Sequence, residues 1–145
     1  MNETPAEATG RCPECGADLD EGVTCQEQLA QVLGWESLDR ELFQLHFYTV
    51  ACFNLQHPAQ FTDEAVDELR STFVVAMDGS TPLETLRRQM GSKFETSRRV
   101  LKDPGDRNPV LREWDVTIAD VYHDGRPEGA SYRVRRWATS IRSRL

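Results

Sequence analysis

The chain has 145 residues, of which 39% are hydrophobic and 28% are charged, and its formal net charge at pH 7 is −7. This size and composition predict a soluble globular domain with its own core, and no stretch approaches the roughly 18 apolar residues of a membrane span. The first ten residues, MNETPAEATG, lack the basic and apolar regions of a secretory signal. We therefore expect a cytoplasmic protein with reduced thiols.

Three cysteines follow this polar lead-in. Cys12 and Cys15 form a C-P-x-C-G knuckle, and Cys25 begins a predicted helix because Thr24 and Glu27 form a capping box. The positive end of a helix dipole favours a thiolate at that position. A redox CxxC pair is the alternative, but no thioredoxin-like context surrounds the motif. Three thiolates are one short of the four ligands of a structural zinc site, so the pattern predicts zinc and a fourth ligand elsewhere.

Capping residues, helix-ending glycines and apolar periodicity predict a mainly α protein. The predicted helices span about residues 25–33, 38–56, 63–78, 82–90, 93–101 and 131–144. Residues 110–122 are the one β-like stretch and fit either a strand or a short helix. We expect a disordered tail over residues 1–10 and a single helical domain over 11–145, which includes a zinc knuckle over 11–25. The expected fold is a small helical bundle with this knuckle packed on the first helical hairpin.

The helix predicted over residues 38–56 is apolar nearly all round, so we expect it to be the central, buried one. If it forms an antiparallel hairpin with the preceding helix and the chain turns near Glu36, Cys25 lies level with about residue 47. That position selects His46 as the fourth ligand. His57 lies 11 residues further along, roughly 16 Å away at about 1.5 Å per residue, and is too distant to bind the same ion.

Other groups can also complete the site. Cys52, His57, His123 and a water molecule are the alternatives, and Cys52 points away from the His46 side of its helix. The predicted zinc ligands are Cys12, Cys15, Cys25 and His46.

Five stretches of the chain follow the order of a known pattern; they are CPECGA, TCQEQL, HFYTVACFNLQHP, TIADVY and VRRWATS. They resemble an uncharacterised bacterial and archaeal family of unknown function. That family has an N-terminal CPxCG, a later Cys, a helix reading H-x-L-x-V-x-x-Y-x-L-Q-H-P and a C-terminal V-x-x-W-A-x-S. Phe53 stands where that pattern has Tyr, so a phenolic hydroxyl is missing there. The resemblance implies a shared fold without an assigned function. It supports six motif positions, which are Cys12, Cys15, Cys25, His46, Gln56 and His57.

The favoured interpretation is a small zinc-binding helical protein with a structural metal and a binding or regulatory role, because a closed Cys3His site leaves no position for water. The first alternative is a metal- or His-dependent enzyme with a pocket near Gln56, His57 and Pro58. There His57 is the candidate general base, and Asp120 could orient it. The competing structural interpretation is that Gln56 and His57 cap the helix end and bond loop carbonyls.

The second alternative is a nucleic-acid-associated protein that uses the Arg-rich second half. Of the 17 Lys and Arg residues, only Arg11, Arg40 and Arg70 precede Gly79. The later ones include three adjacent pairs, Arg87-Arg88, Arg98-Arg99 and Arg135-Arg136. Adjacent arginines on a helix point about 100° apart, so a pair alone makes no stripe, and salt links with acidic residues are the simpler explanation. We expect no membrane partner.

Overall fold

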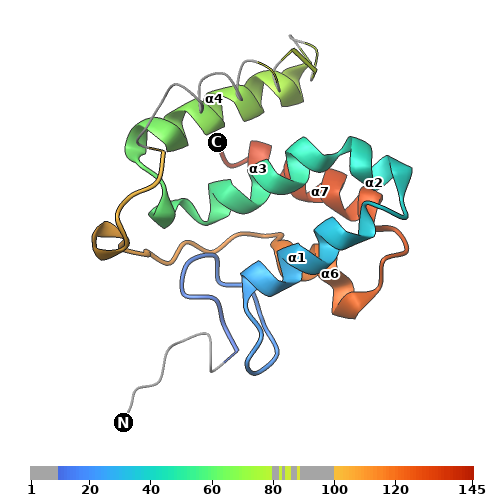
Figure 1. The fold of residues 1–145 in the computed structure, drawn as a ribbon, viewed down its shortest axis with the longest axis horizontal. Helices are drawn as coiled ribbons and strands as arrows, with labels where there is room; N and C mark the ends of the chain where they lie inside the picture. Colours follow the sequence, from blue (N-terminus) through green and yellow to red (C-terminus); the bar gives the residue numbers. More distant parts are fainter. Residues whose placement is uncertain (1–9, 80–81, 83, 86–87, 89–99) are drawn as a thin grey trace.

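The structure is a computed structural model that describes residues 10–79, 82, 84, 85, 88 and 100–145. Within these residues the protein is a small helical bundle with six α-helices and no strand (Figure 1). The helices are α1 (Cys25–Trp35), α2 (Arg40–Gln44), α3 (His46–Gln56), α4 (Asp63–Asp78), α6 (Ile118–Tyr122) and α7 (Ala130–Arg142). Single 3-10 turns follow α3 (η2, Pro58–Gln60) and α6 (η4, His123–Gly125), and a third is η3 (Pro104–Asp106). The predicted mainly α fold is confirmed.

Some sequence predictions fall on residues that the structure does not describe. The tail over residues 1–10 lies outside the described part except for Gly10, and the helices over 82–90 and 93–101 lie largely outside it. Among the described helices, none is long and apolar enough to cross a membrane.

The long helix predicted over residues 38–56 is divided in two. Asp39 caps α2, since its carboxylate accepts the N–H of Leu42 at 3.1 Å. At Leu45 the backbone leaves helical geometry (φ −95°, ψ 10°), and α3 begins at His46. Residues 36–45, which include α2, therefore reverse the direction of the chain. Helix α3 then runs in the opposite direction to α1 (Figure 1).

Helix α3 is the central element, as predicted. It packs against α4 and α7, which also contact each other, while α1 packs against α6. The buried stripe of α7 comprises Val134, Trp137, Ala138 and Ile141, which have helical spacing, whereas Leu145 beyond the helix end is exposed.

Gln56 connects three parts of this core. Its Nε2 donates to the carbonyl of Val116 at 2.8 Å, and its Oε1 accepts from Trp137 Nε1 at 3.1 Å. Gln56 is only 1% exposed, and a buried amide without partners would cost roughly 1–3 kcal/mol. The residue therefore fixes the end of α3 against α7 and against the segment that precedes α6.

The β-like stretch over residues 110–122 contains the short helix α6, so the helical alternative holds there. Asp120 closes its first turn, since its carboxylate accepts the backbone N–H of Thr117 at 2.8 Å. Asp120 is thus a capping residue of α6, and no contact joins it to His57 as the enzyme alternative would need.

Candidate metal centre

The knuckle is a tight turn built around Cys12. The Cys12 N–H donates to the carbonyl of Ala17 and its carbonyl accepts from the Gly16 N–H, both at 3.0 Å. Gly16 has φ +79°, a conformation that disfavours side chains, which explains the glycine after the second cysteine. The Cys12 sulfur accepts the N–H groups of Glu14 and Cys15 at 3.4 Å each. The turn thus holds the first sulfur ready to bind a cation.

Cys25 is held by the start of α1. Thr24 and Glu27 form the predicted capping box, and Cys25 is the first residue of the helix. Its sulfur lies 3.6 Å from that of Cys15, well beyond the roughly 2.05 Å of a disulfide bond, so both thiols are free. The capping signal therefore located this sulfur correctly from sequence.

His57 completes the group. Its Nε2 lies 3.7 Å from the Cys12 sulfur. Its Nδ1 lies 2.7 Å from the carbonyl oxygen of Phe53, so Nδ1 donates a hydrogen bond to that oxygen and Nε2 is the ring nitrogen that faces the Cys12 sulfur. The imidazole also stacks on the Phe53 ring at a centroid distance of 4.1 Å. Phe53 thus orients the histidine with both its carbonyl and its ring, and neither contact needs a phenolic hydroxyl.

The spacing of the four ligand atoms suits a metal ion. The sulfurs of Cys12, Cys15 and Cys25 and a ring nitrogen of His57 all lie within 4.8 Å of one another, and all four residues are buried. A tetrahedral ion with Zn–S bonds of about 2.3 Å and Zn–N bonds of about 2.0–2.1 Å places two sulfurs about 3.8 Å apart, and sulfur and nitrogen about 3.6 Å apart. The separations of 3.6 Å and 3.7 Å are close to these values. The four residues could therefore bind a metal ion.

The pKa values of the cluster residues are also compatible with the binding of a cation. Hydrogen bonds from Cys15 and Cys25 hold the pKa of Cys12 well below its usual range, and contacts with Cys12 and Cys15 raise the pKa of Cys25. Burial disfavours a charge on His57, but hydrogen bonds with the sulfurs of Cys12 and Cys15 raise its pKa to about 10. Cys25 and His57 thus hold protons that a divalent cation would displace, leaving a thiolate and a neutral imidazole beside the Cys12 thiolate.

The structure groups His57, and not the predicted His46, with the three cysteines. Helices α1 and α3 have 11 residues each and run in opposite directions, so Cys25 at the start of α1 lies level with the end of α3 (Figure 1). His46 is at the other end of α3, about 15 Å away. Its Nδ1 lies 2.8 Å from a carboxylate oxygen of Glu36, the residue after α1. The error came from treating residues 38–56 as one helix, which put the turn at Glu36 instead of across residues 36–45.

The other candidate ligands lie elsewhere. Cys52 is completely buried in the core, where burial raises the pKa of its thiol, and it does not belong to the cluster. His123 is exposed in the loop after α6 with φ +50°.

Sequence reasoning missed Glu14, the variable residue of the knuckle. Its carboxylate accepts the N–H of Ala59 at 2.7 Å, and its carbonyl accepts the N–H of Arg112 at 2.9 Å. Burial raises the pKa of this carboxyl, although the Ala59 bond opposes the shift. Glu14 therefore joins the knuckle to the turn that follows His57. The sequence offered one signal for this contact. Pro58 can begin a helical turn, and the free backbone N–H groups at the start of such a turn need an acceptor.

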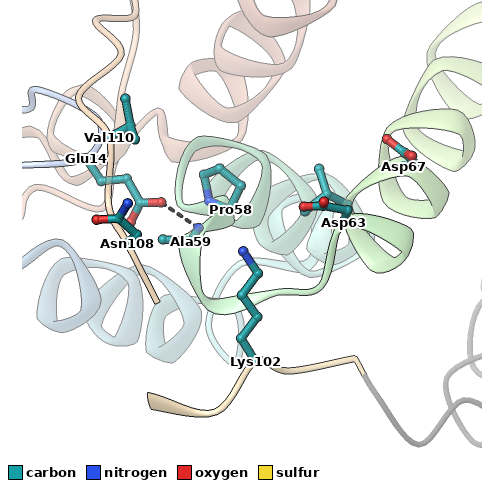
Figure 2. A pocket seen from close by; sticks show the side chains of 9 residues that line it. Glu14, Pro58, Ala59, Asp63, Asp67, Lys102, Asn108 and Val110 are labelled. Carbon is teal, nitrogen blue, oxygen red and sulfur yellow. Dashed lines mark hydrogen bonds between the residues drawn. The ribbon is translucent and has the colours of Figure 1, made fainter. Parts of the chain in front are cut away.

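A cavity of about 430 Å³ lies beside this contact (Figure 2). Its walls include Glu14, Pro58 and Ala59 on one side, with Asp63 and Lys102 facing them. Of the pocket predicted around Gln56, His57 and Pro58, only Pro58 lines it; Gln56 is bonded inside the core and His57 belongs to the cluster. The enzyme alternative thus gains no support from these residues.

The described arginines of the second half are largely used within the molecule. The Arg133 guanidinium donates to the carbonyls of Val121, Arg126 and Glu128, and Arg135 and Arg142 pair with Glu41 and Asp78. Arg112 and Arg144 lie over the Trp114 ring, 4.1 Å and 5.4 Å from its centroid. Arg87, Arg98 and Arg99 lie outside the described residues. These contacts give the nucleic-acid alternative no specific support.

The sequence was compared with models of protein families, with curated proteins and with solved structures. The model of a family of unknown function, DUF5946, matches residues 10–145. No match was found among curated proteins or among solved structures. The match extends from the knuckle to the end of α7, in keeping with the resemblance drawn from the sequence motifs. The chain belongs to DUF5946, a family of unknown function.

Proposed function

We propose that this protein is a zinc-stabilised helical module with a binding or regulatory role, in which Cys12, Cys15, Cys25 and His57 hold a structural Zn²⁺. The observation that carries the proposal is the spacing of the four ligand atoms, all within 4.8 Å of one another. Sulfur-rich tetrahedral sets favour zinc over harder cations such as Mg²⁺ or Ca²⁺. A set of three thiolates and one imidazole fills the four positions of the ion and leaves none for a catalytic water.

The position of the site supports a structural role for the metal. Three ligands come from the knuckle and the start of α1, whereas His57 follows α3, so the ion joins two segments that are 45 residues apart. The Glu14–Ala59 bond connects the same two segments. An ion at this point would hold the knuckle against the helical bundle.

Metal analysis of the full chain, purified without chelators, tests the proposal. We expect about one zinc per chain, and replacement by Co²⁺ should give the visible absorption of a tetrahedral sulfur-ligated ion. A strong chelator should lower the melting temperature, because binding to the folded state alone adds to its stability. Protein that contains no zinc, and binds none when it is added under reducing conditions, would disprove the proposal.

A further inference from the structure

The sulfurs of the cluster differ in their access to solvent. A groove of about 280 Å³ runs along one side of the cluster, and Cys12, Cys25 and His57 line it together with Phe53 and Gln60. Cys15 does not line this groove and is only 1% exposed. A small molecule in the groove can therefore reach two of the three sulfurs but not the third.

The two accessible sulfurs also differ in their hydrogen bonds. The Cys12 sulfur accepts two backbone N–H groups, from Glu14 and Cys15. Within the described residues, no backbone N–H donates to the Cys25 sulfur. Hydrogen bonds withdraw electron density from a thiolate and reduce its nucleophilicity, so Cys25 has the more reactive of the two accessible sulfurs.

Cys15 is placed to react with an oxidised Cys25. The two sulfurs are 3.6 Å apart, and both residues belong to the same cluster. A thiol at this distance behind a cysteine that borders a groove is the arrangement of a resolving cysteine.

We propose that Cys25 is a site of oxidation by hydrogen peroxide, that Cys15 resolves it, and that the resulting disulfide releases the metal; this inference rests on the proposed zinc site. The Cys25 thiolate attacks one peroxide oxygen, forming an S–O bond and expelling hydroxide, to give a sulfenic acid. The Cys15 thiolate then attacks the Cys25 sulfur, forming the S–S bond and expelling a second hydroxide. Two electrons pass from the two thiolates to the peroxide, and the two hydroxides take up protons to become water.

Loss of the metal follows from the number of ligands that remain. A disulfide between Cys15 and Cys25 leaves Cys12 and His57, two ligands where a structural zinc site needs four. Oxidation is thereby converted into release of the ion and loosening of the knuckle from the bundle, and a thiol reductant reverses it.

The test oxidises the zinc-loaded full chain with hydrogen peroxide and follows zinc release with a chromogenic chelator. Samples are alkylated and digested with trypsin and a Glu-specific protease, which separates the cysteines into residues 12–14, 15–21 and 22–27. We expect loss of one zinc per disulfide formed, with the disulfide joining 15–21 to 22–27. A disulfide involving 12–14, or zinc retained while peroxide is consumed, would overturn the inference. Zinc measured before oxidation separates this failure from failure of the proposed site.

Two variants sharpen the assignment. Cys15→Ser lacks the resolving thiol, so a dimedone-type trap for sulfenic acids should label residues 22–27; labelling of 12–14 instead would contradict the choice of Cys25. The matched control is Cys52→Ala, which removes a buried cysteine outside the cluster and should release zinc within about twofold of the parent rate.

Discussion

A histidine lies at each end of α3, which runs antiparallel to α1, but the two histidines contact different partners. At one end His57 lies 3.7 Å from the Cys12 sulfur and is 8% exposed. At the other end His46 lies 2.8 Å from the Glu36 carboxylate, and its side chain is 48% exposed. A contact with one half-exposed partner contributes little to stability, whereas a buried Cys3His set could hold a metal ion. The two histidines at opposite ends of α3 therefore differ in what they can do, and the difference lies in their burial and in the side chains around them.

The largest expected effect separates the two histidines by zinc affinity. His57→Ala removes one of four proposed ligands; if the roughly 10–16 kcal/mol of a structural zinc site divides evenly, the loss is about 3 kcal/mol, or roughly 100-fold in affinity. His46→Ala is the matched control and should change affinity by less than about threefold. Competition titrations with a zinc chelator measure both. Equal losses would show that burial and sulfur neighbours do not distinguish the two ends.

The next effect tests whether the end of α3 beside the cysteine cluster is held in place when no metal is bound. Gln56→Leu leaves the Val116 carbonyl and the Trp137 N–H unpaired inside the core, which should lower the free energy of unfolding by about 2–4 kcal/mol. Chemical denaturation of metal-free protein measures this loss. Gln31→Leu, on the exposed side of α1, is the control and should change stability by less than about 0.5 kcal/mol. A small loss for Gln56→Leu would mean that these two bonds do not secure the end of α3.

A smaller effect concerns the contact between the knuckle and the bundle. Glu14→Ala leaves the Ala59 N–H without its acceptor and should lower stability by about 1 kcal/mol. Glu14→Gln keeps an oxygen acceptor without the charge whose burial is unfavourable, so it should recover most of that loss. Thermal melts of the two variants, compared with Glu21→Ala on the exposed knuckle loop, check the order. If Glu14→Gln loses as much as Glu14→Ala, the negative charge itself is required.

The smallest effect is expected at the opposite end. A double-mutant cycle on Glu36 and His46 should give a coupling of less than about 1 kcal/mol, because one partner is half exposed. The coupling should be the same with and without zinc, since about 15 Å separates the two ends. A coupling that changes when the metal is removed would show that the ends communicate through the α1–α3 pair.

Local signals in the sequence predicted the positions of three of the four cluster residues. The C-P-x-C-G spacing with Gly16 predicted a turn around Cys12, and the Thr24–Glu27 capping box placed Cys25 on the first turn of a helix. Both are short-range features, fixed by hydrogen bonds within a few residues. The three sulfurs could therefore be assigned to one cluster without any knowledge of the fold.

The fourth member of the cluster depended on a long-range feature that the sequence did not reveal. The end of α2 at Leu45 has no proline or glycine to signal it, so residues 38–56 resembled one helix. Placing the turn at Glu36 instead of across residues 36–45 moved the predicted ligand from His57 to His46. The Gln-His-Pro motif did mark the correct region, because Pro58 ends α3 just where the level of Cys25 is reached. The bonds of Gln56 to Trp137 and Val116 join distant segments and also had no local signal.

The 45 residues between Cys12 and His57 have a consequence for the unfolded chain. An ion bound at both ends of that stretch closes a ring, as a disulfide would, and a ring of this length removes roughly 4 kcal/mol of chain entropy from the denatured ensemble. Unlike a covalent bridge, this ring opens whenever the ion is withdrawn. The protein would then have two stability levels set by metal supply, with the same amino-acid sequence at both.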